Sequence, residues 1–433
     1  MNQEKNELNE LDQIRAAESR LLLSTYERNP ILFVRGEGVH VVDENGTKYL
    51  DLLSGIGVNA LGYGHPVIEK AIARQSRVLI HTSNLFYHRG QAELALRLTE
   101  HTGLDRVFFS NTGTEAWEGA LKLARVHAGL LRSEGKQIGT GFLALERSFH
   151  GRTFGSMSTT YKAKYREPFD PVVPGVEFVR FNDVSDLRAK FSSEICAILV
   201  ESIQGEGGVR PLTQEFFVEA RALASSTGAL LIVDEIQSGM GRTGKWCAYQ
   251  HYGVMPDITT LAKPLAGGIP LGAVLCTEEV ARAMHPGMHG TTFGGGPLAC
   301  AVAIAVIDHI ERENLLAHAT DVGDYFQTQL RSLAARHEAI VDVRGKGLMI
   351  AAELDSAELA KLTVAEMLKR RILINCTSDT VLRFLPPYIV ERAHIDTAIA
   401  ALDEIFTEHA AALSSTQVAA RTPARTPGGP NHG

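Results

Sequence analysis

The sequence contains no uninterrupted apolar run of about 18 residues, the length a membrane-spanning helix needs, so we expect no membrane span. It also lacks an excess of basic residues. Its 43 Lys and Arg against 50 Asp and Glu give a net charge of -7, which argues against a nucleic-acid partner. The first residues, MNQEKNELNELDQ, are polar and acidic, unlike a secretory signal or an Arg-rich transit peptide. We therefore expect a cytoplasmic protein.

Cysteine is scarce, and its spacing argues against a disulfide framework or a zinc site. The five cysteines lie far apart in the sequence, without a CxxC pair, at Cys196, Cys247, Cys276, Cys300 and Cys376. We interpret them as unpaired thiols in a reducing compartment. The 16 histidines include no HExxH spacing, so we predict no metal site.

The composition is that of a globular protein with a large core. Of 433 residues, 45% are hydrophobic and 21% charged, and the length favours two or three domains. Short apolar segments typical of strands alternate with amphipathic segments typical of helices. This alternation predicts an α/β fold with a mostly parallel sheet that helices cover on both faces. The predicted strands are 106–110, 197–201, 229–235 and 272–276, and the predicted helices are 114–128, 214–226 and 297–312.

The pattern changes towards both ends of the chain. Residues 38–53 predict a β-hairpin that turns at Asn45-Gly46. From about residue 338, predicted strands at 341–354, 371–376 and 381–387 are interleaved with helices at 357–370 and 393–412. We divide the chain into an N-terminal segment (1–65) that packs with the small domain, a large domain (66–325) and a smaller α/β C-terminal domain (326–413). We expect the first dozen residues and the Pro-, Gly-, Thr- and Ala-rich tail (414–433) to be disordered.

A glycine-rich segment matches two phosphate-binding patterns, but neither in its proper context. Residues 239–244 match G-x-G-x-x-G, yet three residues separate them from the preceding strand and no clear helix follows. Residues 239–245 match G-x-x-x-x-G-K, but Trp246 stands where a P-loop needs Ser or Thr. A glycine-rich loop beside an active site is the better interpretation.

Three other features point to chemistry. In Ser110–Thr114 a strand gives way to a helix, whose first N–H groups can hold a phosphate or simply form an ordinary N-cap. Asp234 ends the most apolar strand, where it can pair with a protonated ring nitrogen or be a loop carboxylate. Lys263 follows an apolar run, where it can be a desolvated nucleophile or a solvated surface charge. Each feature alone permits both interpretations.

In this order, the three features resemble those of the class III aminotransferases, pyridoxal 5'-phosphate enzymes with the aspartate aminotransferase fold (fold type I). The resemblance extends from about Asn29 to Ala411. It is carried by the segments FFSNTGTEA, SFHGRTFGS, VESIQGEGGV, LLIVDEIQSGMGRTG, TTLAKPLAGG and HGTTFGGGPLAC.

The resemblance implies a set of pyridoxal phosphate contacts. Lys263 corresponds to the catalytic Schiff-base lysine, Asp234 to the partner of the pyridine nitrogen, and Phe149 to the aromatic residue stacked on the ring. Gln237 corresponds to the residue near the ring hydroxyl, Ile236 is a further cofactor contact, and Gly113 and Thr114 match the phosphate loop. Thr292 matches a threonine that reaches the phosphate of the neighbouring subunit. The resemblance therefore implies a homodimer with shared active sites.

The resemblance also implies substrate contacts. Arg152 matches an arginine that binds a substrate carboxylate, which suits its planar, bidentate guanidinium. Glu206 and Arg383 match a gating pair, in which the glutamate covers the arginine until 2-oxoglutarate binds. Thr291 is a further expected substrate contact. Ile56 stands where ornithine δ-aminotransferases carry a tyrosine that holds the free α-amino group, so it favours an acylated amine.

Within this class the chain is most similar to the acetylornithine aminotransferases, through residues 55–62, 81–87 and 203–209. That similarity implies transfer of the terminal amino group of N2-acetylornithine to 2-oxoglutarate by a ping-pong mechanism, giving N-acetylglutamate 5-semialdehyde and glutamate in arginine biosynthesis. Other ω-amino donors remain open, namely succinylornithine, an acylated lysine precursor, succinyldiaminopimelate, ornithine or 4-aminobutyrate. So does a decarboxylase or aminomutase on the same scaffold.

Four residues depart from the family pattern. Trp117 stands where these enzymes often have Asn, Ser202 where they have Pro, and Gly296 where they have Asn, and Pro264 follows the lysine.

Overall fold

A computed structural model describes residues 9–421, and the side chains of residues 9–412. Its largest element is a seven-stranded sheet in the order β4-β12-β11-β10-β7-β5-β6. All neighbouring pairs are parallel except the two that involve β12, which is antiparallel to β11 and β4. The mostly parallel sheet predicted from the sequence is thus confirmed. The strands are β4 (Arg106–Ser110), β5 (Gly141–Leu145), β6 (Val176–Val179), β7 (Ile195–Glu201), β10 (Leu230–Asp234), β11 (Ile258–Leu261) and β12 (Gly272–Cys276).

Helices cover both faces of this sheet. As a result, alternate side chains along a strand belong to different hydrophobic cores. Ala197 and Leu199 of β7 lie in a core with α5 (Gly113–Ser133), whereas Ile198 and Val200 lie in one with α8 (Gln214–Thr227) and α10 (Pro297–Arg312). These strand side chains are fully buried. The other helices that accompany this sheet are α3 (Pro66–Ser76), α4 (Arg89–Thr102), α6 (Phe154–Ser158), α7 (Val184–Lys190) and α9 (Glu278–Ala281).

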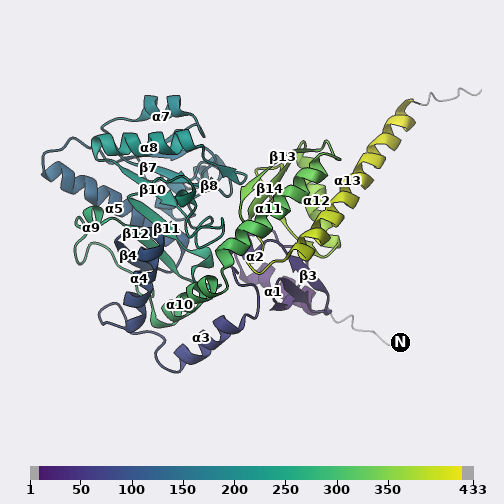
Figure 1. The fold of residues 1–433 in the computed structure, drawn as a ribbon, viewed down its shortest axis with the longest axis horizontal. Helices are drawn as coiled ribbons and strands as arrows, with labels where there is room; N and C mark the ends of the chain where they lie inside the picture. Colours follow the sequence, from purple (N-terminus) through teal and green to yellow (C-terminus); the bar gives the residue numbers. More distant parts are fainter. Residues whose placement is uncertain (1–8, 422–433) are drawn as a thin grey trace, which may run out of the picture.

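Figure 1 shows the large sheet in one lobe and two four-stranded sheets in a second, smaller lobe. One small sheet has the order β13-β14-β17-β16, and the other has the order β1-β2-β3-β15. Since β15 pairs in parallel with β3, the N-terminal strands share a sheet with the C-terminal part of the chain. The strands are β1 (Phe33–Glu37), β2 (His40–Asp43), β3 (Lys48–Asp51), β13 (Ile340–Lys346), β14 (Met349–Leu354), β15 (Ile372–Leu373), β16 (Asn375–Thr377) and β17 (Val381–Phe384).

The predicted hairpin is present. β2 and β3 are antiparallel, and Gly46 in their turn has a φ of 79°, which glycine adopts without strain. Helices α2 (Ser54–Gly57), α11 (Leu315–Ala334), α12 (Ala357–Lys369) and α13 (Arg392–Arg421) complete this lobe. The domain boundaries placed at 65/66 and 325/326 stay predictions.

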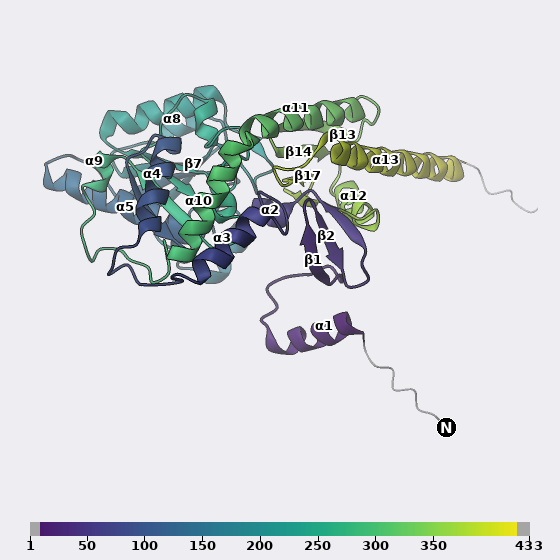
Figure 2. The same cartoon turned by 60° about the horizontal axis from the view of Figure 1, so that its bottom comes forward.

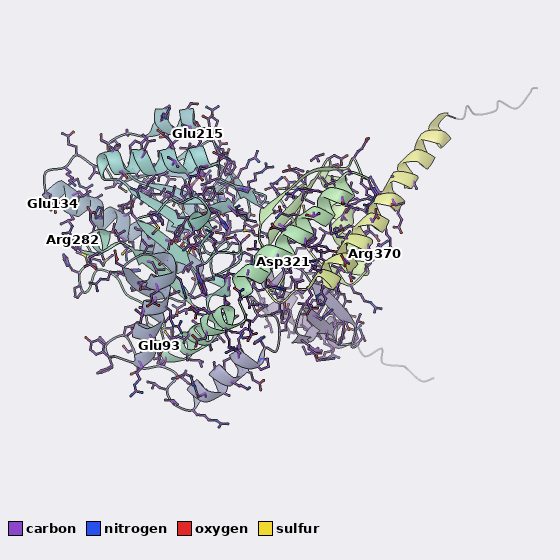
Figure 3. The ribbon with its side chains drawn as sticks, in the orientation of Figure 1. Glu93, Glu134, Glu215, Arg282, Asp321 and Arg370 are labelled. Carbon is purple, nitrogen blue, oxygen red and sulfur yellow. The ribbon has the colours of Figure 1, made fainter. Side chains whose placement is uncertain are left out.

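The two chain ends differ from the expectation of disorder. Helix α13 continues to Arg421, so residues 414–421 are helical; the segment up to Arg421 contains no proline, and Pro423 is the first to follow. Arg370, labelled in Figure 3, ties this helix to the lobe. It forms ion pairs with Glu404 and Glu408 of the helix. At the other end α1 (Glu10–Leu21) begins immediately after Asn9, whose side chain caps it. Residues 1–8 and 422–433 lie outside the described part.

Helix α1 lies apart from the body of the molecule in Figure 2, and none of its side chains is buried. None of the helices within residues 9–421 combines the length and apolar character needed to cross a membrane. Within the same part of the chain, no cluster of three or more His, Cys, Asp or Glu side chains could hold a metal ion.

Candidate active site

A cavity of about 460 Å³ lies at the carboxyl ends of the parallel strands, where ligands bind in open α/β sheets. Its wall combines loops that follow β4, β5, β7, β10 and β11. Nine of the thirteen site residues predicted from the sequence line it: Gly113, Thr114, Phe149, Arg152, Glu206, Asp234, Ile236, Gln237 and Lys263. Sheet register explains why such distant residues meet, since Glu201 is paired with Asp234 and Asp234 with Thr260 on adjacent strands.

Asp234 is a buried carboxylate surrounded by donors. Its Oδ2 lies 2.8 Å from Nδ1 of His150, and its Oδ1 accepts hydrogen bonds from the backbone N–H of Ile236 at 3.0 Å and from Thr260 Oγ1 at 3.3 Å. These contacts fix the plane of the carboxylate at the cavity wall. A fixed acidic group here can pair with a protonated ring nitrogen.

Lys263 begins a short 3-10 turn that directly follows β11, and it lines the cavity. Burial lowers the pKa of Lys263 below that of an exposed lysine; Glu206 opposes this effect and Arg383 adds to it. Among residues 9–412, no side chain or backbone group forms a hydrogen bond or ion pair with its Nζ. Its amine is therefore available to react with a carbonyl group.

The N-terminus of α5 lies where the sequence predicts a phosphate cradle. Thr112 and Glu115 make a reciprocal capping box, in which Glu115 N donates to Thr112 Oγ1 at 3.2 Å and Thr112 N donates to Glu115 Oε2 at 2.9 Å. Gly113 and Thr114 are the first two helical residues, whose N–H groups have no partner within the helix. Both line the cavity, so these groups and the positive helix end suit an anion.

Gly113 has a second reason to be glycine. A Cβ placed on it would come within 2.8 Å of the side chain of Ile236, which is also a cavity residue. Thr114 is held by its hydroxyl, which lies 2.8 Å from Thr153 Oγ1 and 2.8 Å from Ser156 Oγ. The cradle is thus rigid before any ligand binds.

Glu206 and Arg383 form an ion pair across the two lobes, with 2.6 Å between Oε1 and Nη1. Arg383 is fully buried on β17, and it also donates to Gln237 Oε1 at 3.2 Å and to Asn375 Oδ1 at 3.2 Å. Burial opposes the ionisation of Glu206, but Arg383 outweighs it and holds the pKa of Glu206 below its ordinary value. In this state the carboxylate covers the cation.

Arg152 is a cation that no acid neutralises within the described chain. Its guanidinium lies over the ring of Tyr165, with 3.7 Å from Cζ to the ring centroid, and more distantly over Phe149 at 5.8 Å. No salt bridge to it occurs among residues 9–412. A stacked guanidinium keeps its N–H edge free, so Arg152 can bind a carboxylate that enters the cavity.

Besides Arg383, three predicted residues lie outside the cavity wall. Thr291 accepts a hydrogen bond from Asn111 Nδ2 at 3.1 Å, and Thr292 is exposed. Ile56 is 39% exposed in a left-handed conformation with a φ of 64°, unusual for a β-branched residue. Its neighbour Val58 lines the cavity instead. Backbone strain of this kind concentrates at functional positions.

Two cavity residues were missed by sequence reasoning, His150 and Glu201. Glu201 accepts hydrogen bonds from the backbone N–H of Phe149 at 3.1 Å and of Gly205 at 3.0 Å, so one carboxyl group holds the loops of Phe149 and Glu206. Burial, with repulsion from Asp234, raises the pKa of Glu201 to about 8. Its position at the end of the strand next to Asp234 was a signal that could have identified it.

One departure from the family pattern has a structural explanation. Ser202 donates a hydrogen bond of 2.7 Å to Glu235, a fully buried carboxyl group that also accepts from Ser238 Oγ and from the backbone N–H groups of Ala248 and Tyr249. The serine therefore supplies one of the hydrogen bonds that the buried carboxyl group of Glu235 needs.

Comparisons with known proteins show which family the chain resembles. The family model "Aminotransferase class-III" matches residues 23–406. The acetylornithine aminotransferase of Methanocaldococcus jannaschii is 47% identical over 394 residues, which cover 90% of this chain and 97% of that protein. Among solved structures, an ornithine aminotransferase from Toxoplasma gondii with partial occupancy of PLP superposes with a TM-score of 0.88 at 32% identity, over 93% and 95% of the two chains. The acetylornithine aminotransferase from Elizabethkingia anophelis gives 0.81 at 31% identity, over 92% and 99%.

Proposed function

The chain belongs to the class III aminotransferases and is a pyridoxal-phosphate-dependent transaminase, and we propose that its amino donor is N2-acetylornithine and its acceptor 2-oxoglutarate. The observation that carries the proposal is that the site has two separate arginines able to bind a carboxylate. One of them is free and the other is covered. Arg152 is unpaired at the cavity wall, whereas Arg383 is covered by Glu206 at 2.6 Å.

The residues present fit pyridoxal phosphate. Gly113 and Thr114 would hold its phosphate at the helix start, Asp234 its ring nitrogen, and Lys263 its aldehyde carbon. The free amine, the donor-lined carboxylate and the open helix N-terminus all face one cavity, which supports this assignment. When bound, the cofactor supplies an electron sink that stabilises negative charge on the carbon next to the transferred nitrogen.

Lys263 has the second role of moving a proton. Burial lowers the pKa of Lys263, which favours the free amine that can accept a proton from the donor carbon. Asp234 meanwhile stays in place through its three hydrogen-bond partners. Phe149, whose loop Glu201 anchors, would cover one face of the ring.

The two arginines divide the work on substrates. Arg152 would bind the carboxylate common to donor and acceptor. Arg383 would bind the second carboxylate of 2-oxoglutarate once Glu206 moves away, and Glu206 would cover it while the donor is present. One site can then accept a monocarboxylate donor and a dicarboxylate acceptor in turn, as ping-pong exchange requires.

Preference for an acylated donor is supported by apolar residues in the cavity wall. Val58 and Ile203 line it, and Ile56 lies beside Val58. An apolar wall suits an amide better than a free ammonium group, which is costly to desolvate without a partner. The name of the Methanocaldococcus jannaschii relative supports the same donor. We also propose, from the cysteine spacing, that the enzyme acts in the cytoplasm. The proposed donor would place it in arginine biosynthesis.

We further propose a homodimer in which Thr292 of each chain reaches the phosphate site of the other. One line of support is that Thr292 is exposed and lies outside the cavity wall of its own chain. Another is a group of exposed apolar side chains, which comprises Phe293 next to Thr292 and five residues of the 78–87 segment: Val78, Ile80, Leu85, Phe86 and Tyr87. Mixing Lys263→Ala chains with Thr292→Arg chains should restore activity, because a mixed dimer then contains one intact site. Failure to restore it in verified mixed dimers would contradict shared sites.

The donor is tested with purified enzyme, 2-oxoglutarate and a panel of amines, measuring glutamate formed. The panel comprises N2-acetylornithine, N2-succinylornithine, succinyldiaminopimelate, ornithine and 4-aminobutyrate. We expect the highest kcat/KM for N2-acetylornithine. A higher value for ornithine or 4-aminobutyrate would overturn the proposed donor while leaving the transaminase assignment intact.

A further inference from the structure

Trp117 is buried without exposed surface on α5, one turn after the residues that start the phosphate cradle. It is one of two tryptophans in the chain and departs from the asparagine common in the family. Trp117 does not line the cavity. Any effect on the cofactor must therefore pass through a residue that does, and its contacts identify one.

The indole of Trp117 lies parallel to the imidazole of His150, with ring centroids 3.9 Å apart and an angle of 5° between planes. The indole Nε1 donates to Thr159 Oγ1 at 2.9 Å, which fixes the indole within its plane. The backbone N–H of His150 donates to Thr160 Oγ1 at 3.0 Å, which fixes the other end of the histidine.

His150 in turn contacts Asp234, with 2.8 Å between Nδ1 and Oδ2. An ionised carboxylate can only accept hydrogen bonds, so Nδ1 must carry a hydrogen. The other ring nitrogen, Nε2, is buried and has no hydrogen-bond partner among the described residues. One edge of the imidazole thus binds Asp234, and the opposite edge provides no polar contact that would fix its orientation. The stacked face of Trp117 supplies that constraint.

We propose that Trp117 is a positioning residue for pyridoxal phosphate, which holds the imidazole of His150 so that its Nδ1–H keeps Asp234 aimed at the cofactor's ring nitrogen. The inference rests on the role assigned to Asp234 in the proposed function. A flat apolar ring suits this task because it excludes water from one face of the imidazole, and a hydrogen bond to a carboxylate is stronger in such surroundings. An asparagine at position 117 offers neither the area nor the stacking geometry.

The chain contains a matched control. Trp246 also stacks on a histidine, His101, with centroids 3.9 Å apart and 14° between planes, but this pair lies outside the cavity wall. We would compare Trp117→Leu, Trp117→Phe and Trp246→Leu in the full chain. Pyridoxal phosphate is titrated into each cofactor-free protein to obtain its Kd, and the visible absorption maximum of the bound cofactor and the Tm are measured.

We expect Trp117→Leu to raise the Kd for pyridoxal phosphate by about threefold to tenfold and to shift the absorption maximum. Trp117→Phe keeps a stacking face but loses the indole N–H that donates to Thr159, so it should raise the Kd by a smaller factor than Trp117→Leu. Trp246→Leu should lower the Tm without changing either cofactor measurement. A Trp117→Leu protein with parental Kd and absorption maximum would overturn the proposal, as would an equal effect of Trp246→Leu.

Two further variants keep the outcome decisive. If Trp117→Leu does not fold, Thr159→Val removes the acceptor of the indole N–H while retaining both rings, and should raise the Kd by a smaller factor; a parental value overturns the proposal. Asp234→Asn separates the two inferences. If Asp234→Asn leaves the Kd for pyridoxal phosphate unchanged, the role of Asp234 itself fails. If Asp234→Asn raises the Kd while Trp117→Leu keeps the parental Kd, only the role of Trp117 is refuted.

Discussion

Arg383 Nη1 donates to a carboxylate and to an amide at once, namely Glu206 Oε1 at 2.6 Å and Gln237 Oε1 at 3.2 Å. The buried guanidinium is thus neutralised by a residue from the β8–β9 loop (β8, Ile203–Gln204; β9, Arg210–Pro211) and oriented by one beside the cofactor site. Because the Glu206 side chain is 32% exposed and that of Arg383 only 1%, Glu206 can leave the ion pair more easily than Arg383. This asymmetry supports the proposed gate between the two substrates.

Glu206→Gln should therefore impair one half-reaction more than the other. Without the carboxylate, Arg383 stays an uncovered buried cation while the ω-amine donor binds, so kcat/KM for that donor should fall by about tenfold or more. Glutamate, whose second carboxylate covers Arg383, should lose much less. Half-reaction kinetics with each substrate measure the ratio. Glu219→Gln, which breaks the Arg188–Glu219 ion pair outside the cavity, is the control and should leave the ratio unchanged. Equal losses for both substrates in Glu206→Gln would refute the gate.

Tyr165 should set the affinity for the carboxylate that Arg152 binds. The guanidinium lies 3.7 Å from its ring centroid, a contact that contributes about 0.5–2 kcal/mol. Tyr165→Leu should raise KM for the donor by about threefold to tenfold with little change in kcat. Tyr165→Phe, which retains the ring, should keep the parental KM. An unchanged KM in Tyr165→Leu, measured by initial rates over a donor series, would show that Arg152 is positioned by other contacts.

Lys263→Ala should abolish catalytic turnover, since both the covalent attachment and the proton carrier are lost; general acid–base transfer alone accounts for about 10²–10⁴-fold. A small primary amine added to the solution should restore part of the proton transfer in single-turnover measurements. Lys263→Arg should not be rescued, because the guanidinium fills the same space and stays protonated. Steady-state turnover by Lys263→Ala at the parental rate would eliminate the assigned role.

Much of the site was predictable because strand ends and helix starts leave clear local patterns. The apolar run before Asp234 and the T-x-x-E capping box before α5 each lie within a few residues. The antiparallel direction of β12 was not predictable, since GAVLC is equally apolar in both directions. Its pairing with β11 and β4 is decided by the tertiary structure and not by its own residues. The role of His150 depends on an aspartate 84 residues later, and that of Trp117 on a ring 33 positions away, contacts that sequence spacing does not encode.

Glu201 provides a pH-dependent test of the buried acids. Burial raises its pKa from an ordinary 4.5 to about 8, so the native state binds a proton that the unfolded state releases between these values. The stability that Glu201 contributes is therefore fully present below pH 4.5 and is lost as pH rises towards 8, with no further loss above pH 8. Glu201→Gln mimics the protonated group and escapes this loss.

We therefore expect the Tm of cofactor-free Glu201→Gln, relative to the parent, to increase between pH 5 and 8 by a few degrees and then to level off. Differential scanning fluorimetry at each pH measures the difference. Glu134→Gln, at an exposed glutamate that ends α5, is the control and should show a constant difference. If the difference for Glu201→Gln is equally constant, Glu201 is ionised throughout this range, and the hydrogen bonds from Phe149 and Gly205 stabilise a carboxylate instead of a neutral acid.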